Sequence, residues 1–183
     1  LEETRSILRK LDRDHQRKHP GYPELDARIL SYELAARMQM SATDALDVSQ
    51  ENQATQEMYG LNNDLTSSYG RRCLMARRLV ERGVRFVQVY IEYQIWDNHS
   101  NIDKGLRYCC GKTDQPVGAL LKDLKQRGLL DSTLVVWGGE FGRMPFTQMG
   151  SKNVGRDHGP AGFTTWMAGG GVKGGTVYGA TDE

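Results

Sequence analysis

Residues 84–91 read VRFVQVYI, an almost unbroken run of β-branched and aromatic side chains that predicts a buried strand. Residues 133–137 (TLVVW) predict a second strand, and residues 103–127 between them predict a helix that ends near Gly128. Two strands joined by a crossover helix are normally parallel. A third strand is predicted at 162–168. The sequence therefore predicts an α/β fold with a mainly parallel central sheet flanked by helices.

The chain before this strand–helix–strand unit is predicted to be mainly helical. Residues 71–82 carry one apolar stripe, with basic side chains toward the C-terminal end, as expected of a helix. Residues 1–40 carry apolar side chains at helical spacing on both sides of a Pro-Gly-Tyr-Pro joint at 20–23, which predicts a helical pair. We therefore divide the chain into a mainly helical segment, 1–82, that packs on an α/β segment, 83–183, within one incomplete domain.

The composition is that of a globular chain without a strong electric field. Hydrophobic residues make up 38% of 183 residues, enough to bury a core, and the 24 Lys and Arg nearly balance the 23 Asp and Glu. This balance argues against nucleic acid as a partner, and no apolar run approaches the roughly 20 residues that span a bilayer. No leader opens the chain, and both ends are expected to be cut. The three cysteines, Cys73, Cys109 and Cys110, are predicted to be thiols on helices.

Side chains that bind metals are concentrated in three loops near the predicted strands. WDNH at 96–99 follows the first strand, GGEFGR at 138–143 follows the second, and GRDHGP at 155–160 precedes the third. Because ligands bind beyond the carboxyl ends of parallel strands, we expect the three loops to converge. Carboxylates and imidazoles together suit a divalent ion such as Zn²⁺ or Mn²⁺. The candidate metal ligands are Asp97, His99, Glu140, Asp157 and His158.

Each of these loops also has a structural interpretation. Asp97 and His99 could form a turn in which the aspartate organises the backbone ahead of a helix. Glu140 could face solvent in a glycine turn. Asp157 and His158, which lie between two glycines, could belong to an exposed flexible loop.

Two arginines flank the same loops. Arg143 and Arg156 could hold the oxygens of an anionic ester by charge-assisted hydrogen bonds, or they could be ordinary surface arginines. His15 and His19 lie in a charged helical segment and are expected at the surface. No G-x-x-x-x-G-K-[ST] loop is present, and no G-x-G-x-x-G opens a helix, so nucleotide binding is not expected.

Several longer stretches resemble one bacterial family. LVERGVRFVQVY from Leu79, TDQPVGALLKDLKQRGLLDSTLVVWGGEFGR from Thr113 and MAGGGVKGGTVYGATDE from Met167, together with WDNH and GRDHGP, resemble the family catalogued as domain of unknown function 1501. That family is similar to the alkaline phosphatase and sulfatase superfamily. The resemblance covers the whole chain, and family members are typically more than twice as long. It implies the C-terminal portion of an alkaline-phosphatase-like α/β domain.

The resemblance also implies a two-metal site at which sulfate or phosphate esters are hydrolysed. Asp97, His99 and His158 look like the ligands of one metal. The Asp-His pair that binds the second metal in the superfamily falls on Glu140 and Phe141, of which only Glu140 can bind a metal. A changed or single metal site is therefore plausible. The nucleophile would come from the N-terminal half of the family members.

Together these features predict a metal-dependent hydrolase of sulfate or phosphate monoesters, present here without its nucleophile. Zinc or manganese is the expected cofactor, with calcium as a further candidate. The expected partner is a small-molecule or glycan ester. The alternative, which Phe141 favours, is a family member that binds a metal or an anionic glycan without turnover. Export to the periplasm is implied by the resemblance alone.

Overall fold

The structure, a computed structural model, describes residues 2–180. Leu1 and residues 181–183, which belong to the segments 1–82 and 83–183 of the sequence analysis, lie outside the described residues. The side chains of six further residues are also not described: Glu2, Arg5, Met38, Met40, Ser41 and Ala42. Contacts within the chain define two compact units, Leu1–Leu46 and Asp47–Glu183. Each unit is described by itself.

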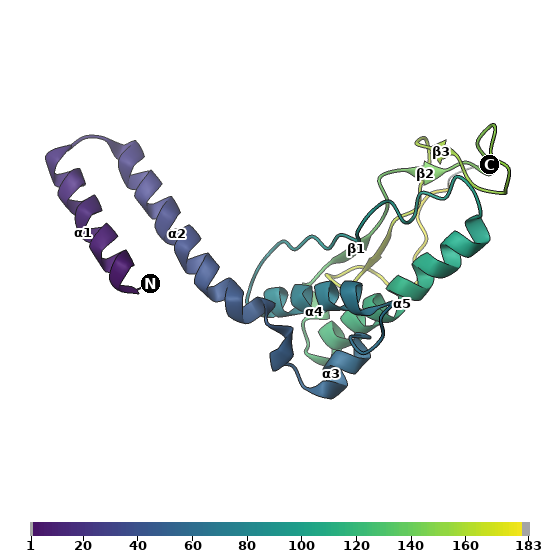
Figure 1. Cartoon of the computed structure of the whole chain (residues 1–183), viewed down its shortest axis with the longest axis horizontal. Coiled ribbons are helices and arrows are strands. Elements are labelled where there is room, and N and C mark those ends of the chain that lie inside the picture. The colour runs from purple at the N-terminus through teal and green to yellow at the C-terminus, as the bar shows by residue number, and fades with distance from the viewer. Residues whose placement is uncertain (1, 181–183) are drawn as a thin grey trace. The chain divides into compact units, whose positions relative to one another are not determined.

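The first unit is a pair of helices, α1 (Glu2–Lys18) and α2 (Pro23–Leu46), joined by a short turn (Figure 1). Gly21 adopts a φ of +94° in this turn, a conformation that glycine reaches without steric cost. An ion pair of 3.1 Å between Arg9 Nε and Glu33 Oε1 joins the two helices. The helical pair predicted from the apolar spacing is confirmed.

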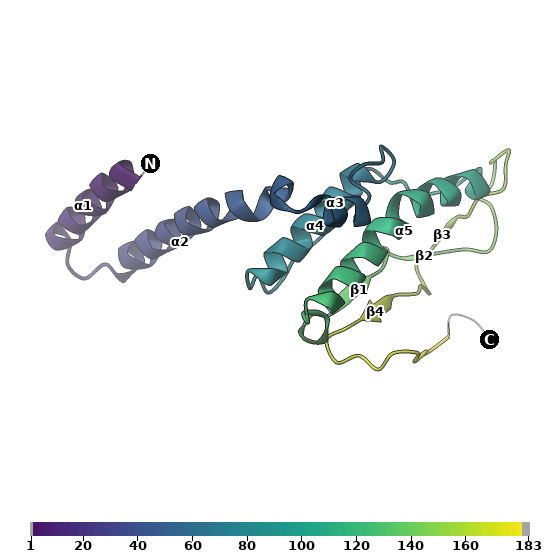
Figure 2. The same cartoon turned by 90° about the horizontal axis from the view of Figure 1, so that it is seen from below.

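The second unit is built on two long helices, α4 (Ser67–Glu81) and α5 (Ile102–Gln126), which lie side by side (Figure 1, Figure 2). The short helices η1 (Val48–Gln50) and α3 (Gln53–Met58) precede them, and η2 (Leu130–Ser132) follows. The two long helices confirm the helices predicted in this part of the chain. Their apolar stripes face the same interior, as expected of amphipathic helices.

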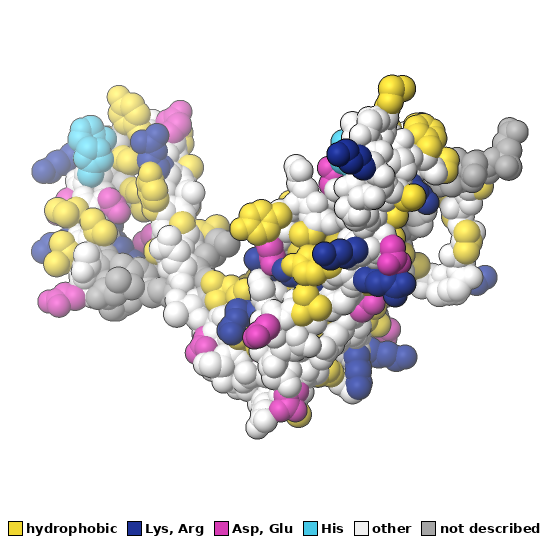
Figure 3. Space-filling view, turned by 45° about the vertical axis from the view of Figure 1, so that its right-hand side comes forward, with side chains coloured by type: hydrophobic (Ala, Val, Ile, Leu, Met, Phe, Trp, Pro, Cys, Tyr) yellow, Lys and Arg dark blue, Asp and Glu magenta, His cyan; other side chains and the backbone are white. Residues whose placement is uncertain are grey.

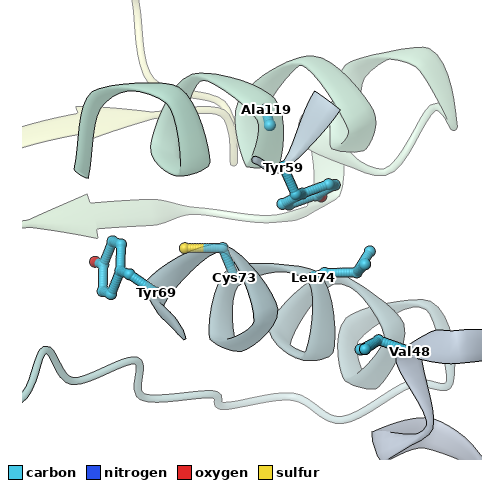
Figure 4. Close-up of a cluster of buried hydrophobic side chains, with 6 residues drawn as sticks. All are labelled: Val48, Tyr59, Tyr69, Cys73, Leu74 and Ala119. Carbon is cyan, nitrogen blue, oxygen red and sulfur yellow. The ribbon is translucent and has the colours of Figure 1, made fainter. Parts of the chain in front are cut away.

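The core of the second unit lies between α4 and α5. Tyr59 points into this space and is fully buried, and its hydroxyl donates a 3.0 Å hydrogen bond to the Asp123 carboxylate. Gly70 permits the close approach, because a Cβ at this position would lie 2.1 Å from the carbonyl oxygen of Tyr59. The buried hydrophobic cluster in Figure 4 consists of Val48, Tyr59, Tyr69, Cys73, Leu74 and Ala119.

Paired charges adjoin this core. Arg77 has only 1% of its side chain exposed and forms ion pairs with Glu51 at 2.8 Å, Glu81 at 2.5 Å and Asp123 at 2.8 Å. Desolvation opposes ionisation of both Arg77 and Glu51, but the paired charges outweigh it. The pKa of Glu51 is therefore lowered and that of Arg77 is raised. Both Arg77 and Glu51 are therefore charged in the folded protein at neutral pH.

The strands form two small antiparallel sheets. β1 (Val135–Trp137) pairs with β4 (Trp166–Ala168), and β2 (Gly142–Arg143) pairs with β3 (His158–Gly159). The predicted mainly parallel central sheet flanked by helices, which the family resemblance also implied, is therefore wrong. Residues 84–91 form no strand and have no ladder partner within the described part of the chain. Their composition favours a strand locally, whereas pairing requires a distant partner that composition does not specify.

Charges of both signs are distributed over the surface. In Figure 3, dark blue and magenta side chains lie among one another on the visible face, in keeping with the formal net charge of +1. Among residues 2–180, no helix combines the length and the apolar character that crossing a bilayer requires.

The three thiols differ in accessibility, which leads to a first prediction. Burial raises the pKa of Cys73 to about 12 and also raises that of Cys109, and both side chains are at most 1% exposed. Cys110 is only partly buried. In the native protein, Ellman's reagent should therefore label one thiol rapidly, and the Cys110→Ser variant should lose this phase. Labelling of Cys73 at the same rate would contradict the packing of α4 on α5, and labelling of Cys109 would contradict its burial beside the carbonyl of Ile95.

Candidate metal centre

Aromatic packing fixes the loop that carries Asp97. The ring of Trp96 meets Trp137 of β1 edge-on, with 5.8 Å between ring centroids. Trp137 in turn stacks on Trp166, its register partner in β4, at 6.3 Å. All three tryptophans of the chain thus gather at one place. Because large rings in contact restrict one another, they hold the backbone at Asp97 in a defined position beside the β1–β4 sheet.

The 155–160 loop docks on the same segment through its backbone. The N–H of Arg156 donates to the carbonyl of Asn98 at 2.9 Å. Gly155 is required here, because a Cβ would lie 2.0 Å from the carbonyl oxygen of His99. Two loops that are far apart in the sequence therefore come into direct contact, and each brings a histidine.

The β2–β3 pair brings the third loop to the same place. Arg143 and His158 are register partners in this pair. Gly142 lies so close to the backbone of residue 162 that a Cβ would be 1.8 Å from the carbonyl oxygen of Gly162. Gly142, Gly155 and Gly159 therefore serve close backbone packing, which helps to place the side chains of the two loops. The expected convergence of the three loops is present, although the sheets within residues 2–180 are antiparallel and not parallel.

Three side chains present ligand atoms to one another. Asp97 Oδ1 lies 3.0 Å from His99 Nε2 and 3.3 Å from His158 Nε2, and the two nitrogens are 3.1 Å apart. A tetrahedral ion with bonds of about 2.0–2.1 Å holds its ligand atoms about 3.3 Å from one another. The three atoms thus have nearly the spacing of one face of such a tetrahedron. Two imidazoles and a carboxylate also match the ligand preference of zinc and manganese.

The positive charge of Arg143 pairs with the carboxylate of Asp97 in this group. Its guanidinium contacts Asp97 Oδ1, lies 2.9 Å from Glu140 Oε1, and sits over the Phe141 ring at 5.2 Å. Desolvation opposes ionisation of Asp97, but the hydrogen bonds from Arg143 and His158 outweigh it, so the pKa of Asp97 is lowered. Asp97 is therefore ionised at neutral pH, as a metal ligand has to be.

The predicted ligands do not all occupy equivalent places. Asp97, His99 and His158 form the group whose ligand atoms all lie within 4.8 Å of one another. Glu140 stands outside it, with 63% of its side chain exposed and its carboxylate turned to the arginine. Asp157 lies on the far side of the His99 ring from the ligand atoms, with its Oδ1 3.9 Å from Nδ1 of His99. The same oxygen accepts a hydrogen bond of 2.8 Å from the backbone N–H of His158.

The two predicted substrate-binding arginines are also placed differently. Arg143 borders the three-residue group, whereas the Arg156 guanidinium donates to the carbonyl of Gly155 at 2.8 Å, within its own loop. Phe141 packs against the imidazole of His158, with 4.7 Å between ring centroids, and so restricts its rotation. That contact was not expected from the sequence, since only the inability of Phe141 to bind a metal was apparent there.

One family model matches this chain. It is described as a protein of unknown function (DUF1501), and the match extends over residues 2–183. No curated protein and no solved structure gives a significant match. The match confirms the family resemblance of the sequence, and it leaves the activity to be argued from the site.

Proposed function

The chain belongs to the DUF1501 family, and we propose that it binds a divalent metal ion through Asp97, His99 and His158. The observation that carries the proposal is the spacing of the three ligand atoms, 3.0 Å, 3.1 Å and 3.3 Å. Three protein ligands leave a fourth position for water or substrate, which is typical of catalytic and not of closed structural zinc sites. Zinc or manganese is favoured over calcium, because calcium prefers oxygen ligands alone.

We further propose that this centre serves the hydrolysis of sulfate or phosphate monoesters. A bound divalent ion would supply Lewis-acid polarisation of the ester oxygen. Arg143 supports the proposal because its guanidinium borders the group and can donate to the non-bridging oxygens of an anionic ester. The relation to the alkaline phosphatase and sulfatase superfamily is part of this proposal. It rests on the carboxylate and imidazole ligands and not on the topology of the sheets, which are antiparallel. The nucleophile is not assigned to any of the described residues.

Binding without turnover is the second candidate, and a specific contact favours it. Phe141 places an apolar ring against His158, at the position where the family resemblance implies a histidine ligand for a second ion. A centre limited to one ion could retain a metal or an anionic glycan and lack the second charge that assists ester cleavage.

Chromogenic esters distinguish the two candidates. Tested in the protein together with the N-terminal half that is expected to supply the nucleophile, 4-nitrophenyl sulfate or 4-nitrophenyl phosphate should be hydrolysed above the buffer rate. We expect this activity to disappear on chelation and to return with zinc or manganese. The His158→Ala variant should show only the buffer rate, because it loses one of three ligands. A wild-type protein that retains metal yet hydrolyses neither ester would contradict the hydrolase proposal and leave the binding candidate.

A further inference from the structure

One nitrogen at the proposed centre lacks a hydrogen-bond partner. Nδ1 of His99 is buried and has no hydrogen bond among the described residues, whereas Nε2 of the same ring faces Asp97 and His158. A neutral imidazole carries its proton on one nitrogen only. If Nε2 is to offer a lone pair to a metal, the proton must reside on Nδ1, and a buried N–H needs an acceptor.

Asp157 is the carboxylate placed to accept a hydrogen bond from that N–H. Its Oδ1 lies 3.9 Å from His99 Nδ1, which is within ion-pair range but about 1 Å longer than a hydrogen bond. The backbone of Asp157 is held from both sides, because its N–H donates to Phe146 O at 3.1 Å and its carbonyl accepts from Met144 N at 2.8 Å. Only a small movement of the Asp157 side chain is therefore needed to close the gap.

Asp157 lies on the wrong side of the ring to be a ligand itself. Nδ1 and Nε2 point in different directions from one imidazole, and the other two ligand atoms lie at Nε2. The group that could hold an ion includes Asp97, His99 and His158 but not Asp157. A carboxylate in this place can act only through the histidine.

We propose that Asp157 is a positioning residue that accepts a hydrogen bond from Nδ1–H of His99, and thereby fixes the tautomer and orientation in which Nε2 binds the metal. The inference rests on the proposed metal function. Carboxylates behind histidine ligands orient the ring and make it a stronger donor, and their loss typically costs 10- to 100-fold in metal affinity. Because Asp157 Oδ1 also accepts the N–H of His158, one carboxylate would support both histidine ligands.

The test compares Asp157→Ala and Asp157→Asn, with Asp114→Ala as the control at an exposed site on α5. Zinc affinity is measured by competition with a chelating indicator, and the tautomer of His99 by its ¹⁵N shifts in the zinc-bound protein. We expect Asp157→Ala to lower the affinity for zinc by about 10- to 100-fold and to shift the ¹⁵N resonance of His99 Nδ1. Asp157→Asn should lose less affinity, because its amide oxygen still accepts a hydrogen bond. Asp114→Ala should match the wild type.

Three outcomes would overturn the inference, and each has a different consequence. If Asp157→Ala leaves the zinc affinity and the ¹⁵N shifts of His99 unchanged, Asp157 does not position His99, and the proposed metal site is unaffected. An equal and severe loss in both Asp157 variants, as large as that of His158→Ala, would make Asp157 a direct ligand. A wild-type protein that binds no zinc would overturn the proposed function as well. If Asp157→Ala does not fold, the affinity and shifts of Asp157→Asn decide.

Discussion

Replacing Arg77 with methionine should lower the free energy of unfolding by about 3–5 kcal/mol, the loss typical of breaking a buried ion pair. The Arg77 side chain is 1% exposed and contacts three carboxylates, those of Glu51, Glu81 and Asp123. Methionine fills similar space but carries no charge, so the side chains of Glu51 and Asp123, at most 10% exposed, lose this partner while they remain buried. Arg127 still contacts Asp123 at 2.8 Å, which places the expected loss toward the lower end of the range.

Urea denaturation followed by circular dichroism measures this effect. Arg71→Met is the matched control, because Arg71 lies on the same helix and is exposed, and its unfolding free energy should change by no more than about 0.5 kcal/mol. A loss below about 1 kcal/mol for Arg77→Met would be that of a surface ion pair, and would contradict a buried network at this position.

Removing a histidine of the metal centre should have the second large effect. His99→Ala or His158→Ala leaves two of the three ligands, so zinc affinity should fall by more than the roughly 10- to 100-fold typical of changes behind the ligands. Competition with a chelating indicator measures the dissociation constant. His19→Ala is the control, since His19 is exposed and stacks on His15 in the first unit. Equal affinity in His99→Ala, His158→Ala and His19→Ala would show that zinc binds elsewhere.

The helices could be predicted from the sequence because their signals are local. Apolar side chains at helical spacing, together with glycine and proline at the ends, predicted α1, α2, α4 and α5. Strand pairing could not be predicted in the same way. Residues 84–91 have the composition of a buried strand yet form no ladder with any other described residue. Val135–Trp137 pairs in antiparallel fashion with a segment about 30 residues later.

The candidate site could be predicted in part, for a related reason. The residue types in three loops indicated Asp97, His99 and His158, which the structure brings together. Glu140 and Asp157 carry the same chemical group, and only their contacts show that one turns to an arginine and the other stands behind the histidines. Side-chain direction depends on packing between distant segments, which residue type alone does not reveal.

The buried charges of the second unit gave no sequence signal. Arg77 reads as one of several basic residues on an amphipathic helix, and its partners Glu51 and Asp123 lie far from it in the sequence. Since charged side chains are almost never fully buried unless they are paired, residue type alone gives no reason to place Arg77 in the core. Arg77 is buried because α4 packs against α5, which brings it next to Asp123.

The most direct test of the metal centre is the metal content of the purified chain after loading with zinc or manganese and removal of unbound ions. Inductively coupled plasma mass spectrometry should give about one ion per chain for the wild type, in keeping with one three-ligand site. The double variant His99→Ala, His158→Ala should retain close to none. A metal-free wild type, or equal metal content in the two proteins, would contradict a site at Asp97, His99 and His158.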